Sequence, residues 1–132
     1  MNTFSFTGKQ LFFVLSLAIL VPASAVVAHE WMAPKEAADM ENQIATNAES
    51  IARGKELFLD NCAACHGDKA KGLTADEAGL EKSTPNLPQR LASHTDGDFF
   101  WKIQHGRGDM PSFKESLSSR EIWDIINFIK DN

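Results

Sequence analysis

The sequence Cys62-Ala-Ala-Cys65-His66 constrains this chain more than any other stretch. In a helical turn, Cys65 and His66 follow Cys62 by three and four residues, so the three side chains project from one face. Two thiols on that face can add to the two vinyl groups of a haem, and the imidazole can bind the iron beneath the ring. We therefore predict one haem c, attached covalently through Cys62 and Cys65, with His66 as the proximal iron ligand.

Other interpretations of a C-x-x-C stretch fit this chain less well. A thioredoxin-like redox pair would need a β-α-β context, and no such pattern surrounds residue 62. A structural zinc site would need two further Cys or His ligands at regular spacing. The chain has no third cysteine, and its other histidines, His29, His94 and His105, are scattered. A simple disulfide would not require His66.

Residues 1–28 have the features of a secretory signal peptide, and we keep them out of the fold. Lys9 is the only charged residue in this segment, and the apolar run Leu11–Val21 follows it before a proline and small residues. Cleavage could follow Ala25 or Ala28. The alternative is a retained membrane anchor, because the apolar character continues to the end of the segment and approaches the lower length limit of a membrane span.

Charge and cysteine usage indicate the compartment and the partners. Both cysteines would be consumed by haem, which suits an oxidising, exported location such as the periplasm. Without Lys9, the 13 Lys and Arg become 12 against 18 Asp and Glu, so the mature net charge would be about −6. This balance argues against nucleic acid as a partner. We expect redox protein partners, and contact with a membrane only through a partner complex or a retained leader.

Helical patterns organise the rest of the chain. Residues 29–47 have few apolar anchors, so we expect a largely solvated linker or docking arm, on which Trp31 and Met32 are candidates for docking. The domain then spans residues 48–132. A first helix is expected from residue 48 to 61, with Asn47 as its cap. Gly54 inside it costs about 1 kcal/mol relative to Ala, so we expect another helix to approach closely there.

The second half of the domain contains two further helix signals. Pro85 and Pro88 predict extended or turning chain over residues 83–90. Thr95 and Asp98 mark the start of a helix that glycines end near residue 106. The last helix begins with a capping box of two residues and continues with isoleucines at helical spacing. The two residues of this capping box are Ser118 and Glu121.

Met110 is the candidate for the second axial ligand. It lies in the irregular stretch Gly-Arg-Gly-Asp-Met-Pro of residues 106–111, where glycines allow close backbone approach and the proline restricts the methionine to extended geometry. The other mature methionines lie in the polar arm. His94 and His105 are formal competitors for the sixth position, but we expect both at the surface.

These features occur in an order that resembles the class I cytochromes c, and the resemblance covers about residues 48–132. It implies an all-α fold in which the N- and C-terminal helices cross, here at Gly54 and Phe128, with further short helices and loops around one haem. It also implies that the Pro85 carbonyl accepts a hydrogen bond from the proximal imidazole and that Leu87 packs on the ring. The ligand set would be His66 and Met110.

The resemblance and the ligand set together predict a carrier of single electrons between respiratory partners, not an enzyme. With both axial positions filled, the iron can change oxidation state but offers no site to a substrate. Two alternatives stay open. One is a haem-bearing subunit of a membrane respiratory complex, and the other is a ligand-binding haem enzyme or sensor with an open sixth site. The donor and the acceptor are not identified by the sequence.

Overall fold

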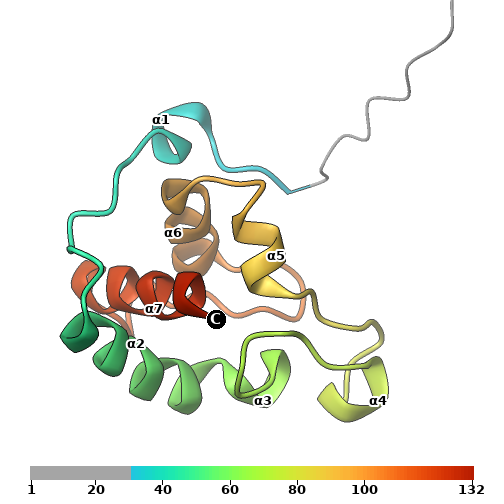
Figure 1. The fold of residues 1–132 in the computed structure, drawn as a ribbon. Coiled ribbons are helices and arrows are strands. Elements are labelled where there is room, and N and C mark those ends of the chain that lie inside the picture. Colours follow the sequence, from blue (N-terminus) through green and yellow to red (C-terminus); the bar gives the residue numbers. More distant parts are fainter. Residues whose placement is uncertain (1–30) are drawn as a thin grey trace, which may run out of the picture.

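A computed structural model describes residues 31–132 of the chain. The helices in this range surround a compact core, and no β-strand is present among the described residues (Figure 1). The all-α class expected from the sequence is therefore confirmed. The helices are α1 (Lys35–Ala38), α2 (Ala48–Asn61), α3 (Ala63–His66), α4 (Ala75–Ala78), α5 (Leu87–Leu91), α6 (Asp96–His105) and α7 (Ser119–Asp131). The expected signal peptide and its cleavage sites lie outside the described residues.

Helices α2 and α7 form the central pair of the fold. Helix α2 begins where predicted, because the Asn47 side chain accepts a hydrogen bond from the Ser50 amide at 2.9 Å. A Cβ atom on Gly54 would lie 1.9 Å from the carbonyl oxygen of Asp124, so only glycine permits this crossing. The expected role of Gly54 is confirmed. The crossing partner is the backbone of Asp124, and Phe128 instead packs one turn further along against Phe58, with ring centroids 5.2 Å apart.

Helix α7 supplies more of the core than any other helix. Its predicted capping box is formed: the Ser118 hydroxyl accepts from the Glu121 amide, and the Glu121 carboxylate accepts from the Ser118 amide. The four isoleucines at helical spacing are all buried, at Ile122, Ile125, Ile126 and Ile129. Each large side chain that is fully buried contributes roughly 1.5–3 kcal/mol. Stacking of Trp123 on Phe100, at 4.1 Å between ring centroids, joins α7 to α6.

The segment before α6 is partly helical, which differs from the sequence prediction. Extended or turning chain was expected over residues 83–90, yet α5 begins at Leu87. Asn86 caps this short helix by accepting a hydrogen bond from the Gln89 amide at 3.0 Å. Pro88 lies in the first turn, where a missing N–H costs nothing. Helix α6 agrees with the prediction, since the Thr95 side chain caps its start and it ends at His105.

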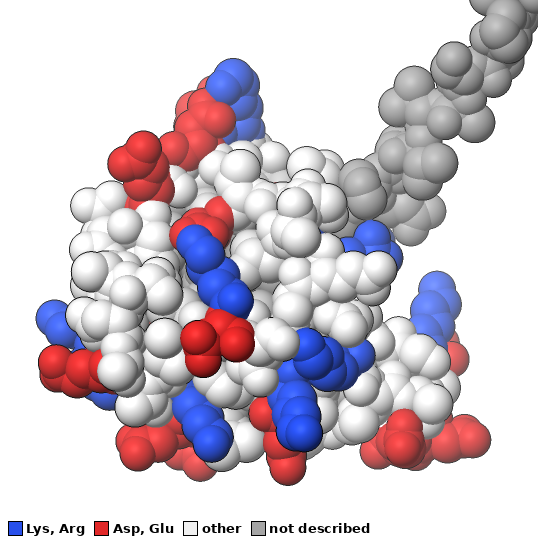
Figure 2. Space-filling view, in the orientation of Figure 1, with Lys and Arg blue, Asp and Glu red and all other residues white. Residues whose placement is uncertain are grey.

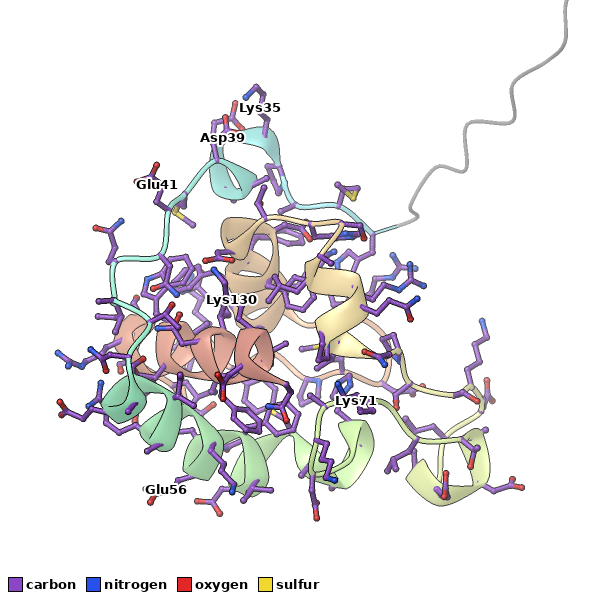
Figure 3. The ribbon with its side chains drawn as sticks, viewed as in Figure 1. Lys35, Asp39, Glu41, Glu56, Lys71 and Lys130 are labelled. Carbon is purple, nitrogen blue, oxygen red and sulfur yellow. The ribbon has the colours of Figure 1, made fainter. Side chains whose placement is uncertain are left out.

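The arm of residues 31–47 runs across the outside of α6 and on to the start of α2 (Figure 1). Most of its residues are exposed, but it is tied to the domain by side chains. Buried Asn127 of α7 accepts hydrogen bonds from Asn42 and Thr46 at 2.9 and 2.8 Å, and donates to the Ile44 carbonyl at 3.1 Å. An exposed ion pair between Lys35 and Asp39 points away from the domain (Figure 3). The arm is thus a docked segment of the fold.

Two properties of the described surface bear on partners. Within residues 31–132, no helix has both the length and the apolar character that crossing a membrane requires. Figure 2 shows Lys and Arg interspersed with Asp and Glu over the visible face, without a broad area of one sign. Lys130 exemplifies the mixing, because its ammonium lies 2.9 Å from a carboxylate oxygen of Asp96.

Candidate functional site

The stretch Cys62–His66 forms a single helical turn directly after α2. The Cys62 carbonyl accepts hydrogen bonds from the amides of Cys65 and His66, at 3.1 and 2.9 Å. These bonds place all three side chains on one side of the turn, as the spacing predicts. Both cysteines are half-buried and neither forms a disulfide. The two thiols therefore lie one turn apart in the arrangement that attachment to two haem vinyl groups requires.

Burial controls the protonation of this turn. It raises the pKa of the Cys62 thiol to about 12, with a smaller contribution from neighbouring Cys65. It lowers the pKa of His66, so the imidazole is neutral at physiological pH. Neutral imidazole is the form that binds a metal. The turn therefore presents His66 in the state needed for iron ligation.

His66 also contains an orphaned polar atom. Its ring nitrogen Nδ1 is buried and has no hydrogen-bond partner among the described residues. Buried polar atoms are rarely left unpaired, so such an atom needs an explanation. A metal-bound histidine holds the metal with one ring nitrogen and donates from the other. The residues of this turn, two thiols and one neutral imidazole, fit a covalently bound haem.

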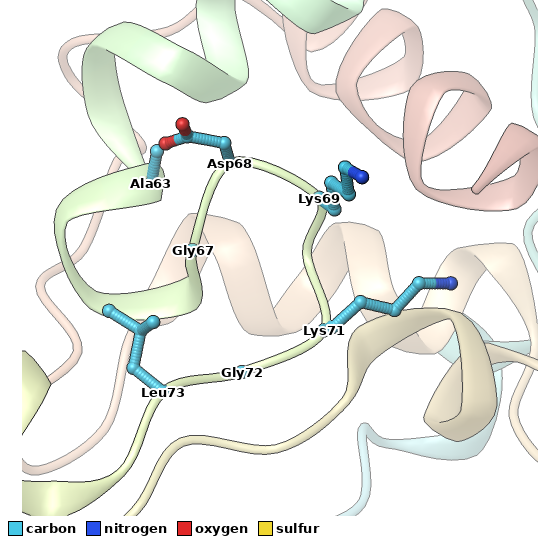
Figure 4. Close-up of a pocket in the computed structure, with 7 residues that line it drawn as sticks. All are labelled: Ala63, Gly67, Asp68, Lys69, Lys71, Gly72 and Leu73. Atoms are coloured by element: carbon cyan, nitrogen blue, oxygen red, sulfur yellow. The ribbon is translucent and has the colours of Figure 1, made fainter.

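The chain after His66 returns sharply towards the same turn. Gly67, Ala70 and Gly72 all have positive φ, at 72°, 57° and 83°. The Gly72 amide donates to the His66 carbonyl at 3.0 Å, which closes the loop. The loop borders a shallow pocket beside α3 (Figure 4), lined by Ala63, Gly67, Asp68, Lys69, Lys71, Gly72 and Leu73. The pocket adjoins the haem turn at Ala63 and Gly67, but neither the cysteines nor His66 line it.

The segment around Pro85 lies beside the haem turn, in part as expected. Thr84 donates from its hydroxyl to the Cys65 carbonyl at 2.6 Å, and the Leu87 amide donates to the Ala70 carbonyl at 2.8 Å. Leu87 is partly buried and packs against the core. These two contacts hold the segment against the residues that follow the cysteines.

The hydrogen bond expected between the Pro85 carbonyl and the His66 imidazole is not formed in the structure, since Nδ1 of His66 has no partner. The Pro85 carbonyl instead lies against Gly72, where an added Cβ would be 3.0 Å from its oxygen. The loop of Gly72 and the Pro85 segment therefore pack backbone against backbone.

Met110 lies in a tight loop between α6 and α7. Its carbonyl accepts from the Arg107 amide at 2.9 Å, and its amide donates to the Arg107 carbonyl at 3.1 Å. Gly106 allows this closure, because a Cβ there would lie 2.4 Å from the Met110 carbonyl oxygen. The Met110 side chain is half-buried and packs against the core. The loop thus holds the thioether at the edge of the core.

The two competing histidines are engaged elsewhere. His105 is exposed as expected, stacks on Trp101 with ring centroids 4.3 Å apart, and has its Nδ1 2.8 Å from the Trp101 carbonyl oxygen. The surface position expected for His94 is wrong, since only 4% of its side chain is exposed. Its Nε2 lies 3.9 Å from a carboxylate oxygen of Asp98, and its ring meets Phe99 edge-on.

Sequence reasoning missed two residues that position the site. Thr84 joins the Pro85 segment to the haem turn, and a hydroxyl residue directly before the predicted proline was the available signal. Gly97 lets the arm approach α6, because a Cβ there would lie 2.2 Å from the Ala37 carbonyl oxygen. No local pattern marks Gly97, since its partner is 60 residues away in the sequence.

Comparison with known proteins finds c-type cytochromes among the relatives of this chain. Residues 49–129 match a family described as cytochrome c oxidase, cbb3-type, subunit III. Cytochrome c6 of Thermosynechococcus vestitus is 28% identical over 84 residues, covering 64% of this chain and 71% of the relative. Cytochrome c6 of Synechocystis sp. is 30% identical over 88 residues, covering 64% and 67%. The cbb3-type cytochrome c oxidase subunit CcoP of Rhodobacter capsulatus is 33% identical over 93 residues, covering 58% of this chain and 27% of the relative.

The helical fold, the Cys62–His66 turn and these matches define a monohaem c-type cytochrome. Within that class, the chain belongs to the family described as cytochrome c oxidase, cbb3-type, subunit III, whose model matches more than half of its length. Its cofactor is one covalently bound haem c, and the chain supplies only two cysteines. It is an electron-transfer protein with redox protein partners, not an enzyme.

Proposed function

We propose that this protein is an exported carrier of single electrons between respiratory partners. In this proposal the haem is held by Cys62 and Cys65, with His66 and Met110 as the axial iron ligands. The observation that carries the ligand assignment is the half-buried imidazole of His66, which lies one turn from Cys62 and whose buried Nδ1 has no partner among the described residues. The Met110 loop supports the second ligand, since Gly106 and Arg107 hold it closed against the core.

Each residue has a distinct task in this mechanism. Bound haem c supplies a one-electron Fe(II)/Fe(III) couple. His66 would present a ring nitrogen and Met110 a thioether to the iron, which would then offer no open position to a substrate. The tightly crossed α2 and α7 keep the haem turn in a constant position, so little structural change accompanies electron transfer. Pro85 and Leu87 remain predicted haem neighbours, with Leu87 supported by its partial burial.

Partner recognition follows from charge. The mature chain would have a net charge of about −6, from 12 Lys and Arg (all 13 except Lys9) against 18 Asp and Glu. Electrostatic complementarity then favours a partner with a basic or largely apolar contact surface.

The test is absorption spectroscopy of the haem-loaded protein. The wild type should show c-type bands when reduced, and a weak far-red sulfur-to-iron charge-transfer band when oxidised. Met110→Ala should keep the covalent haem, lose the sulfur band and bind carbon monoxide readily when reduced. Met32→Ala is the matched control, because Met32 is 51% exposed on the arm, and it should behave as the wild type. A sulfur band that survives in Met110→Ala would overturn the ligand assignment and favour a different sixth ligand.

A second candidate function is supported by the family match and by similarity to CcoP. In this alternative the protein is a haem-bearing subunit of a membrane respiratory complex. Gentle detergent extraction distinguishes the two. A free, soluble monomer supports the carrier, whereas recovery of the haem only in a large membrane complex supports the subunit.

A further inference from the structure

Trp31, near the start of the arm, contacts two cationic side chains that belong to different elements of the fold. The Lys102 ammonium and the Arg107 guanidinium carbon each lie 5.5 Å from the centroid of its indole ring. Lys102 belongs to α6, whereas Arg107 belongs to the loop that contains Met110. One aromatic side chain of the arm therefore joins a core helix to the loop of the proposed second axial ligand.

The helical end of this contact is anchored by a buried carboxylate. Asp98 is 1% exposed, and one of its oxygens lies 2.5 Å from the Lys102 ammonium. Its other oxygen accepts a hydrogen bond from the Ala33 amide at 2.7 Å. Ala33 is two residues from Trp31, so the same carboxylate fixes both the arm backbone and one of the cations. Two contacts therefore hold the indole against α6: the Ala33 amide on Asp98, and the Lys102 ammonium on the indole ring.

On the loop side of the contact, Arg107 is hydrogen-bonded directly to Met110, the proposed iron ligand. Arg107 and Met110 exchange two backbone hydrogen bonds, at 2.9 and 3.1 Å, which close a turn of four residues. If Met110 moved outwards, these two hydrogen bonds would break or Arg107 would move with it. A contact that holds the Arg107 side chain therefore opposes opening of the Met110 loop.

The remainder of the arm is pressed against α6 and keeps Trp31 in place. A Cβ on Gly97 would lie 2.2 Å from the Ala37 carbonyl oxygen and 2.7 Å from that of Met40. The Thr95 hydroxyl donates to the Ala38 carbonyl at 2.5 Å. Such close backbone packing is typical of a built part of a fold and not of a solvated tail. Figure 1 shows this stretch passing over α6.

We propose that residues 31–40 form a strap that positions the Met110 loop, with Trp31 as the positioning residue. The strap keeps the thioether in place by holding Arg107, and so it lowers the exchange of Met110 for other ligands. This inference rests on the proposed function, in which Met110 is the second axial ligand. It gives the arm, which lies outside the domain expected from sequence, a role at the redox site.

The test is imidazole competition in the full-length, haem-loaded ferric protein. Imidazole replaces the methionine, and loss of the sulfur-to-iron band measures its apparent Kd. Trp31→Ala should bind imidazole about two- to fivefold more tightly than the wild type, as expected from loss of one exposed cation–π contact. Trp31→Phe retains an aromatic face and should restore most of the wild-type value. Met32→Ala, at the adjacent exposed position, should match the wild type.

A second variant changes Arg107, the loop residue of the contact. Arg107→Gln should also tighten imidazole binding, and combining it with Trp31→Ala should give less than the sum of the two effects, because both changes remove the cation–π contact between these residues. An unchanged imidazole Kd in Trp31→Ala, even with a lower unfolding temperature, would show a purely structural role and overturn the strap. A wild type without a sulfur band would instead overturn the assignment of Met110, and the strap with it. The two failures are therefore distinguishable.

Discussion

Gly54 and Asp124 approach so closely that a Cβ atom on the glycine would lie 1.9 Å from the carbonyl oxygen of the aspartate. Around this contact, α2 and α7 pack along much of their lengths. The haem turn begins at Cys62, immediately after α2 ends at Asn61. The position of the cysteines relative to the core therefore depends on how closely α2 and α7 approach each other at Gly54.

Replacing Gly54 with alanine should destabilise the protein strongly. The added methyl group meets backbone, which cannot move away as a flexible side chain can, so we expect a loss of about 2 kcal/mol or more in the free energy of unfolding. Urea unfolding of the haem-loaded protein measures it. Glu56→Ala, on the outer face of the same helix (Figure 3), is the control and should change stability by less than about 0.5 kcal/mol. Equal stability of Gly54→Ala and the wild type would contradict the crossing.

Asp124 should make the stability depend on pH in the acid range. Burial tends to raise its pKa, but hydrogen bonds from Arg53 and Ser50 outweigh burial, so the pKa lies below its usual value. A carboxyl with a lower pKa in the folded state stabilises the protein above the unfolded pKa of about 3.9, and this contribution is lost as pH falls through the folded pKa. Unfolding measured from pH 7 to pH 3 should show this loss.

Asp124→Asn is the matched variant for that series. It should be less stable than the wild type at pH 7 by about 1.5–3 kcal/mol, the usual value of a hydrogen bond to a charged group. The difference between the two proteins should shrink on acidification below about pH 4. A constant difference from pH 7 to pH 3 would show that ionisation of Asp124 contributes nothing.

The cap of α7 can be tested at two adjacent serines. Ser118→Ala removes the hydroxyl that accepts from the Glu121 amide, so we expect a loss of about 1 kcal/mol. Ser119→Ala changes an exposed serine in the first turn and should cost much less. Chemical unfolding of both variants gives the comparison, and equal losses would rule out a specific capping role for Ser118.

Docking of the arm should depend on Gly97. Gly97→Ala places a methyl group against the carbonyl of Ala37, so the arm should lift from α6. Limited proteolysis with an enzyme that does not cut at lysine should then cleave within residues 33–46 faster than in the wild type. Lys35→Ala removes only an exposed ion pair with Asp39 and should leave the cleavage rate unchanged. Equal cleavage of Gly97→Ala and the wild type would mean that the arm tolerates the added methyl group.

Covalent attachment should require both cysteines. Cys62→Ala and Cys65→Ala each leave one thiol, so we expect a much lower yield of covalent haem and at most one thioether. Mass spectrometry and haem staining of the denatured protein measure the yield. Ala64→Ser, at the exposed position between the cysteines, should attach haem normally. Normal attachment in either cysteine variant would show that this thiol is dispensable.

The features that the sequence predicted well depend on residues close together in the chain. Asn47 caps α2, and Ser118 with Glu121 caps α7, because each bond spans only three residues. The haem turn likewise follows from spacing within five residues, Cys62 to His66. Gly54 was recognised because glycine is costly inside a helix unless something approaches it.

The features that the sequence did not predict are of two kinds. The short helix α5 has a local cap at Asn86, and His94 lies beside Asp98 four residues further on, so both depend on nearby residues whose burial and capping were not foreseen. The packing of the Pro85 carbonyl against Gly72 instead joins two separate loops. A sequence pattern contains no information on which distant backbone will fill the space beside a residue.

The chemistry of this protein follows from its amino-acid sequence: two thiols and an imidazole on one turn, a methionine in a glycine-bounded loop, and helices that begin at their caps. These are properties of short stretches, set by covalent spacing and local hydrogen bonds. The docking of the arm on α6 at Gly97, which brings Trp31 to Arg107, appears in the tertiary structure alone. Those contacts join segments far apart in the chain, and close backbone packing at Gly97 holds them, which no local pattern encodes.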